Sequence, residues 1–278
     1  GKKKIDQLKI RELDENTKEI IASHHDRIVN YMDNITQKEL VGYQYIRKKE
    51  NAVAKVKRNE RVIVDSTNSD DYGVYPKNIC ISSWNTPSED SDETYEKCLL
   101  FPFIPIYNLG IYKSWGIAHI ENLSDVVYNK TAIDKLVLDD NRKDIILALI
   151  QTDKSNRKID DFIDKKNDNI IFMLHGEPGV GKTLTAEAVA EILEKPLYKI
   201  SVGDLELNPD HLESCLKEID NLCCDWGAIL LIDEADIFLE SRDLSNINRN
   251  AIVSIFLQFL EYNQNIIFLT NFIYSFKV

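Results

Sequence analysis

The sequence of 278 residues contains no apolar run near the ~18 residues that a membrane-spanning helix needs. Its longest candidate, residues 98–107, is short and is interrupted by Pro102 and Pro105. The first residues, Gly-Lys-Lys-Lys, are not followed by an apolar stretch, so they do not resemble a signal peptide. Apolar residues make up 44% of the chain and charged residues 29%. We therefore expect a soluble protein with a sizeable core and no membrane segment.

Cysteine is scarce, and neither the cysteines nor the histidines have a metal-ligand spacing. The five cysteines include no C-x-x-C pair, and the five histidines are scattered. This pattern predicts neither a disulfide framework nor a zinc site. Reduced thiols in the core indicate a cytoplasmic or nuclear location. The cysteines are Cys80, Cys98, Cys215, Cys223 and Cys224.

The net charge of −12 is unevenly distributed along the chain. Residues 131–278 carry 15 basic against 26 acidic side chains, so we expect no nucleic acid to bind through general electrostatics. Residues 1–60 carry 14 basic against 10 acidic side chains. A solvated surface explains this excess most simply, and a docking patch for an acidic partner is the alternative. The basic residues of this region include Arg47, Lys48, Lys49, Lys55, Lys57 and Arg58.

The pattern changes near residue 130, which predicts an accessory region, 1–130, and a core, 131–278. The accessory region leans toward β structure, with a short strand at 61–65, irregular or β structure at 98–120 and an acidic exposed loop at 85–97. The core has four apolar segments of strand length, separated by helical patterns, with a polar loop at 151–168. Such alternation predicts an α/β fold with a parallel sheet and flanking helices. The strand segments are 170–174, 197–202, 228–232 and 266–270, and the helical ones are 144–150, 184–193, 209–223 and 249–262.

Residues 176–183 read Gly-Glu-Pro-Gly-Val-Gly-Lys-Thr and fit the phosphate-loop pattern G-x-x-x-x-G-K-[ST], between an apolar strand and a helix. The glycines allow a tight turn whose N–H groups face a phosphate, and the helix N-terminus adds positive potential. Lys182 can reach the β- and γ-phosphates of ATP, and the Thr183 hydroxyl can bind Mg²⁺. The predicted nucleotide-binding residues are Gly176, Glu177, Pro178, Gly179, Val180, Gly181, Lys182, Thr183 and Leu184.

A second acidic motif follows the apolar strand at 228–232, where the chain reads Asp-Glu-Ala-Asp from Asp233. Asp233 would hold Mg²⁺ and Glu234 would act as general base toward an attacking water. A solvated turn is the alternative for two carboxylates alone, but the phosphate loop 50 residues upstream favours the metal site. The same four letters also occur in RNA helicases. Nothing upstream resembles their adenine-reading glutamine motif, and the acidic core is a poor RNA surface.

Four stretches together resemble the AAA-family ATPases, and the first and third overlap the Walker A and Walker B motifs. The stretches are 177–190, 196–205, 231–240 and 249–257. The similarity is strong over 130–271 and extends, in a subgroup abundant in fungi, to the link at 115–138. The resemblance implies a P-loop NTPase fold, ATP and Mg²⁺ as cofactors, Lys182 and Glu234 as catalytic residues, and Thr183 and Asp233 as metal ligands. It also implies a ring, usually of six subunits, that remodels a macromolecular partner.

The sequence departs from that family in three places. Counting from Asp233 puts Phe272 at the polar sensor position, with Asn271, the candidate sensor, one residue earlier. The chain ends at Val278, before the family's arginine fingers, fifth core strand and helical lid. The aromatic pore loop is not evident in 203–210. Because the family's fifth strand covers the first, we expect 170–174 to be an exposed apolar edge.

These departures, with the missing initial methionine, predict a truncated product or a faulty gene model. We expect an ATP-binding, ATP-hydrolysing AAA-type ATPase whose hydrolysis is slow in this form. A nucleotide-binding interaction protein that does not hydrolyse ATP is the main alternative, and a DEAD-box-like RNA helicase is the third.

Overall fold

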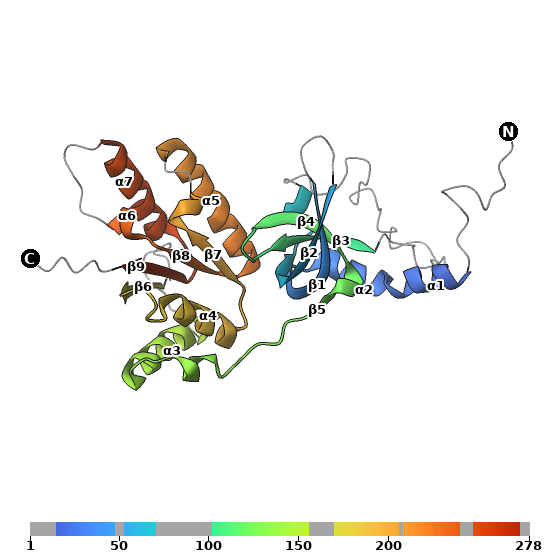
Figure 1. The fold of residues 1–278 in the computed structure, drawn as a ribbon, viewed down its shortest axis with the longest axis horizontal. Coiled ribbons are helices and arrows are strands. Elements are labelled where there is room, and N and C mark those ends of the chain that lie inside the picture. Colours follow the sequence, from blue (N-terminus) through green and yellow to red (C-terminus); the bar gives the residue numbers. More distant parts are fainter. Residues whose placement is uncertain are drawn as a thin grey trace, which may run out of the picture. The chain divides into compact units, whose positions relative to one another are not determined.

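The computed structural model describes residues 15–47, 53–70, 102–155, 170–205, 208–239 and 247–272. The chain divides into two compact units, Gly1–Val126 and Val127–Val278, which are described separately (Figure 1). Cys80, Cys98 and the acidic loop expected at 85–97 lie outside the described residues. In the part of the chain that the structure covers, no helix is both long and apolar enough to span a bilayer.

The first unit is built on an antiparallel sheet that closes on itself. β1 and β2 pair along their whole length, β2 continues to β3, β3 to β4, and β4 returns to β1. β5 pairs with the remaining edge of β1. The prediction of a β-leaning region is confirmed, but the strand expected at 61–65 is much longer. The strands are β1 (Thr36–Arg47), β2 (Val53–Val64), β3 (Phe103–Asn108), β4 (Ser114–His119) and β5 (Leu123–Asp125).

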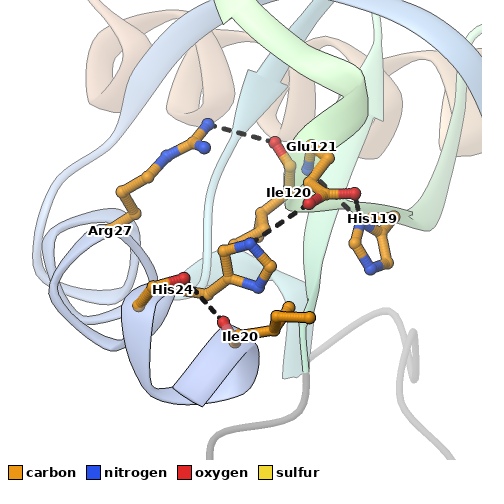
Figure 2. Close-up of polar contacts among 7 residues, drawn as sticks. Ile20, His24, Arg27, His119, Ile120 and Glu121 are labelled. Carbon is orange, nitrogen blue, oxygen red and sulfur yellow. Dashed lines mark hydrogen bonds and ion pairs between the residues drawn. The ribbon is translucent and has the colours of Figure 1, made fainter. Parts of the chain in front are cut away.

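Two helices precede this sheet, α1 (Glu15–Ser23) and α2 (His25–Asp33). Ile28 and Tyr31 of α2 are buried in one core cluster with apolar side chains of all five strands. Polar contacts fix the start of α2 on the segment after β4, as Figure 2 shows. Arg27 Nη2 donates to the carbonyl oxygen of Ile120 at 3.2 Å, and His24 Nε2 lies 3.3 Å from Glu121 Oε1. The helix therefore belongs to the core of this unit, although residues 1–60 show no clean apolar period.

The basic residues of the first unit lie partly on aromatic rings. Lys55 Nζ is 4.0 Å from the ring centre of Tyr43, and Tyr43 itself is paired in register with Lys57 on β2. The Arg58 guanidinium lies 5.0 Å from the ring centre of Tyr112. These contacts cover part of the charge with apolar surface. A docking patch for an acidic partner stays a prediction.

The second unit holds a parallel sheet in the order β6-β9-β8-β7, which confirms the predicted α/β fold. All four predicted strands and the helices between them are present. The strands are β6 (Ile171–Gly176), β7 (Leu197–Ser201), β8 (Ile229–Asp233) and β9 (Ile267–Phe272). The helices are α3 (Asp140–Ser155), α4 (Lys182–Leu193), α5 (Pro209–Trp226), α6 (Asp236–Leu239) and α7 (Ile247–Tyr262).

Helices cover both faces of this sheet (Figure 1). On one face, α3 and α4 pack on β8 and β9 through apolar residues that include Ile146, Val189 and Phe268. On the other, α5 packs against α7, and Trp226 of α5 lies with its ring centre 5.9 Å from that of Tyr198 on β7. One apolar face of α5 is buried, and Cys215 beside it is half-buried; the buried residues are Leu212, Leu216, Ile219, Leu222 and Cys223.

One boundary differs from expectation. The polar loop expected at 151–168 is wrong at its start, because α3 continues through 151–155 and lacks a Gly or Pro that would end it there. Residues 156–169 lie outside the described part of the chain. β6 pairs with β9 alone among the described strands, and its Ile171 and Met173 side chains are 40% and 54% exposed. The strand is therefore an apolar edge, as expected.

Candidate functional site

The glycine-rich loop joins the end of β6 to the start of α4. Gly179 and Gly181 have φ angles of +81° and +92°, in the left-handed region that side chains other than glycine rarely adopt. A Cβ atom at either position would meet nothing within 4 Å. The backbone angle, and not the available space, is therefore what requires glycine there.

The first turn of α4 is open to an anion. Its N-cap residue, Gly181, has no side chain that could accept a hydrogen bond from the first N–H groups of the helix. Unpaired N–H groups at a helix N-terminus bind phosphate through hydrogen bonds and the helix dipole. Lys182 Nζ donates to the carbonyl oxygens of Gly176 at 2.7 Å and Glu177 at 2.9 Å, so its side chain connects the end of the loop to its start. The loop thus has the chemistry of a phosphate cradle.

The remaining predicted loop residues face outward. Glu177, Pro178 and Val180 are exposed, and the Leu184 side chain on the first turn of α4 is 49% exposed. Their contribution to nucleotide binding through side chains stays a prediction.

Asp233 ends β8 and gathers three donors. Its Oδ2 accepts the Thr183 hydroxyl at 3.2 Å and lies 3.0 Å from Lys199 Nζ, while its Oδ1 accepts the Thr270 hydroxyl. Burial by itself raises the pKa of Asp233. The hydrogen bonds from Thr270 and Lys199 and the positive charge of Lys199 outweigh burial, so the pKa lies below its ordinary value. The carboxyl group is therefore held as an anion beside the phosphate loop.

Glu234, the expected general base, has an unusual backbone. Its φ angle is +62°, which costs a residue with a side chain roughly 1–2 kcal/mol. Its N–H donates to Thr270 Oγ1 at 3.0 Å, and the next N–H, of Ala235, donates to the Thr270 carbonyl oxygen at 2.8 Å. The side chain is exposed. Strained conformations of this kind persist where neighbours hold them and are common at functional sites.

Asn271 lies beside the phosphate loop. It is paired in register with His175, and its Oδ1 is 2.5 Å from His175 Nδ1. Phe272 is paired in register with Gly176, the first residue of the loop. On β9, the side chain that donates a hydrogen bond to the carboxyl group of Asp233 is that of Thr270. A sensor role for Asn271 stays a prediction.

Three residues at this site were not anticipated: Thr270, Lys199 and His175. Each lies at or near the carboxyl end of a parallel strand, and these ends meet at one edge of the sheet. The polar side chains near the ends of the predicted strands were the available signal.

The oxygen atoms of Thr183 and Asp233 are suitable ligands for a magnesium ion held together with a nucleotide. Thr183 and Asp233 bring a hydroxyl and a carboxylate together, and Mg²⁺ prefers oxygen ligands, typically one or two from protein with the rest from phosphate and water. Within the described ranges, no group of three or more His, Cys, Asp or Glu side chains could hold a metal ion. A metal here would therefore depend on phosphate oxygens.

The parallel sheet with its flanking helices, the glycine-rich loop and the acidic end of β8 define a P-loop NTPase fold. Residues 172–276 match the model of the AAA family, the ATPase family associated with various cellular activities. This part of the chain is an AAA-family domain.

Two curated proteins are similar to the chain. The replication factor C large subunit of Picrophilus torridus is 30% identical over 158 residues, which are 54% of this chain and 36% of that protein. The peroxisomal ATPase pex6 of Schizosaccharomyces pombe is 35% identical over 81 residues, 28% of this chain and 8% of that protein. The chain thus spans about a third of the first relative and less than a tenth of the second.

Two solved structures also resemble it at low identity. One, described as the structural basis for katanin self-assembly, has a TM-score of 0.37 at 20% identity and covers 52% of this chain and 47% of its own. The other, the HORMA:CdnC:Trip13 complex of E. coli MS115-1, has a TM-score of 0.39 at 17% identity and covers 52% and 59%. Scores this low bear on no functional conclusion.

Proposed function

We propose that this chain binds ATP with Mg²⁺ and hydrolyses it to ADP and phosphate. The observation that carries the proposal is the hydrogen bond between Thr183 and Asp233, which joins the phosphate loop to the acidic strand end. These two motifs are 50 residues apart in the sequence, and an NTPase needs them at one point. Membership of the AAA family supports an ATPase-type function.

Each residue has a distinct task in this proposal. The N–H groups of the loop and of the first turn of α4 bind phosphate oxygens, and Lys182 turns from the loop carbonyls toward the β- and γ-phosphates. Thr183 and Asp233 would hold a metal ion, which would supply positive charge against the charge that develops on the phosphate during hydrolysis. Glu234 accepts a proton from the attacking water, and Thr270 holds its backbone in place.

The test is a titration of the full chain with a fluorescent ATP analogue in the presence of Mg²⁺. We expect Lys182→Ala to abolish binding, because the substitution removes the only side-chain cation of the phosphate-loop motif. Lys217→Ala is the matched control, since this lysine pairs with Glu213 on the surface of α5. Unchanged binding by Lys182→Ala would reject the assignment.

A second variant separates hydrolysis from binding. Glu234→Gln removes the base and keeps the shape, so we expect it to bind ATP and retain it without turnover. If the unchanged chain binds ATP but shows no turnover, and Glu234→Gln retains ATP no longer, the non-hydrolysing interaction protein is the better hypothesis. Turnover stimulated by RNA would instead support the helicase alternative.

We further propose a ring of subunits, six by resemblance to the family, that remodels a macromolecular partner. Measuring molecular mass with and without nucleotide tests the assembly, and an unchanged monomeric mass would contradict it. A cytoplasmic or nuclear location is also proposed, because the cysteine pattern of the sequence predicts no disulfide framework.

A further inference from the structure

The cation beside Asp233 comes from the neighbouring strand, outside both nucleotide-binding motifs. Lys199 lies on β7, two residues before Ser201, which is paired in register with Asp233. Its side chain extends toward the carboxyl end of the sheet and brings Nζ to 3.0 Å from Asp233 Oδ2. The same oxygen accepts the Thr183 hydroxyl at 3.2 Å. The ammonium group therefore shares with the Thr183 hydroxyl one oxygen of a carboxylate that is a proposed metal ligand.

The surroundings of this pair allow the lysine to leave. The Asp233 side chain is 19% exposed, while that of Lys199 is 44% exposed. The carboxylate is thus fixed by Thr183 and Thr270, whereas the lysine reaches it from the solvent side. A long, flexible lysine loses a well-ordered position at little cost when a stronger cation arrives.

We propose that Lys199 is a competitor of Mg²⁺ at Asp233 and sets the Mg²⁺ concentration at which the nucleotide site takes up metal. This inference rests on the proposed ATP binding. Without metal, the ammonium group neutralises Asp233 and supplies positive charge near the phosphates, so ATP binds with reduced dependence on Mg²⁺. With metal, the repulsion between Mg²⁺ and the ammonium group drives Lys199 away, which weakens metal binding.

The alternative is that the pair only stabilises the fold. Ion pairs with exposed partners contribute little, since solvent screens them and the side chains lose freedom. A structural role would lower the stability of Lys199 variants and leave the Mg²⁺ dependence unchanged. The two roles therefore predict different readouts.

The experiment measures the affinity of the full chain for the fluorescent ATP analogue in EDTA and over a series of Mg²⁺ concentrations. Lys199→Gln removes the charge and keeps hydrogen-bonding atoms, and Lys199→Arg keeps the charge. Lys217→Gln is the matched control on the surface of α5. We expect Lys199→Gln to lower the Mg²⁺ midpoint about tenfold and to weaken binding in EDTA a few-fold. Lys199→Arg and Lys217→Gln should stay within twofold of the unchanged chain.

The outcomes separate the two proposals. A Lys199→Gln midpoint within twofold of the unchanged chain, with nucleotide still bound, overturns the competition alone. Absence of binding by the unchanged chain at every Mg²⁺ concentration overturns the proposed function and, with it, this inference. If Lys199→Gln does not fold, Lys199→Met is measured in its place, with the same expected shift of the Mg²⁺ midpoint. If Lys199→Arg lowers the Mg²⁺ midpoint as far as the neutral variant does, the role of charge is overturned.

Discussion

Thr270 offers the sharpest test of how the acidic end of β8 is held. Its side chain is fully buried, and its hydroxyl donates to Asp233 Oδ1 and accepts the N–H of Glu234 at 3.0 Å. Thr270→Val replaces that hydroxyl with a methyl group of similar size. The substitution therefore removes two hydrogen bonds while leaving the packing of β9 nearly intact.

The expected loss of stability follows from these two bonds. A hydrogen bond to a charged group contributes about 1.5–3 kcal/mol, and a neutral one about 0.5–1.5 kcal/mol. Asp233 retains Thr183 and Lys199 on its other oxygen and is 19% exposed, so water compensates part of the loss. We expect Thr270→Val to lower the free energy of unfolding by about 1.5–3 kcal/mol. Thr270→Ser keeps the hydroxyl and loses a buried methyl group, for about 1 kcal/mol.

Hydrogen exchange measured on peptides that cover β8 and β9 gives the free energy of opening of the second unit without interference from the first. A cost of Thr270→Val under about 0.5 kcal/mol, the lower bound for one hydrogen bond, would contradict the role of the Thr270 hydroxyl. A cost below that of Thr270→Ser would contradict it as well.

Acid provides an independent check on the same variant. Because the folded chain lowers the pKa of Asp233, this carboxyl contributes stability above its ordinary value of 3.8, and the contribution is lost as the pH falls through the lowered pKa. Thr270→Val brings that pKa back toward its ordinary value. The stability difference between the two chains should therefore be full at neutral pH and shrink below the ordinary pKa. A difference that does not change with pH would show that Asp233 is not the partner that matters.

Two further predictions concern strain and the exposed edge. Glu234 and Glu194 have φ angles of +62° and +56°. Replacing either with glycine relieves backbone strain but gives the unfolded chain more freedom, so Glu234→Gly and Glu194→Gly should each raise the free energy of unfolding by about 0.5–1 kcal/mol. Urea unfolding measures this change. Only Glu234→Gly should abolish hydrolysis, and a destabilised Glu234→Gly beside a stabilised Glu194→Gly would contradict the strain at that residue. Met173 is 54% exposed on the edge strand β6, so Met173→Lys should reduce self-association of the protein at high concentration and leave its ATP affinity unchanged. Sedimentation velocity measures the association, and undiminished association would argue against contact between β6 edges.

The site could be predicted from the sequence where it depends on consecutive residues. The loop before Lys182 and the carboxylates after β8 are local, because glycine conformations and a strand end decide where these groups point. The contacts of Asp233 with Lys199 and Thr270 could not be predicted in the same way. They depend on the strand order β6-β9-β8-β7, which puts the last strand in the sequence between the first and the third. Alternation of strands and helices indicates a parallel sheet but does not give that order.

The first unit was less predictable because its longest strands lack a regular apolar pattern. In β2 the positions that alternate toward the interior include Arg58 and Glu60, whose side chains are 12% and 24% exposed. Charged side chains at half-buried positions of a strand obscure the apolar period of two on which the assignment of strands depends. Closure of the sheet also requires pairing between β1 and β4, whose paired residues are separated by more than seventy positions in the sequence. Non-local pairing of this kind leaves no local signal.

β9 contacts both the strand end before the phosphate loop and the acidic end of β8. Near its carboxyl end, Asn271 contacts His175 before the phosphate loop, and the preceding residue, Thr270, contacts Asp233 and Glu234. One short segment therefore links the loop that would bind phosphate to the residue that would activate water. Glu234 holds its strained backbone through Thr270, so the orientation of the proposed base depends on β9. A chain with both motifs intact but a disturbed β9 should accordingly bind ATP and hydrolyse it slowly, because binding needs the loop while hydrolysis needs the linkage.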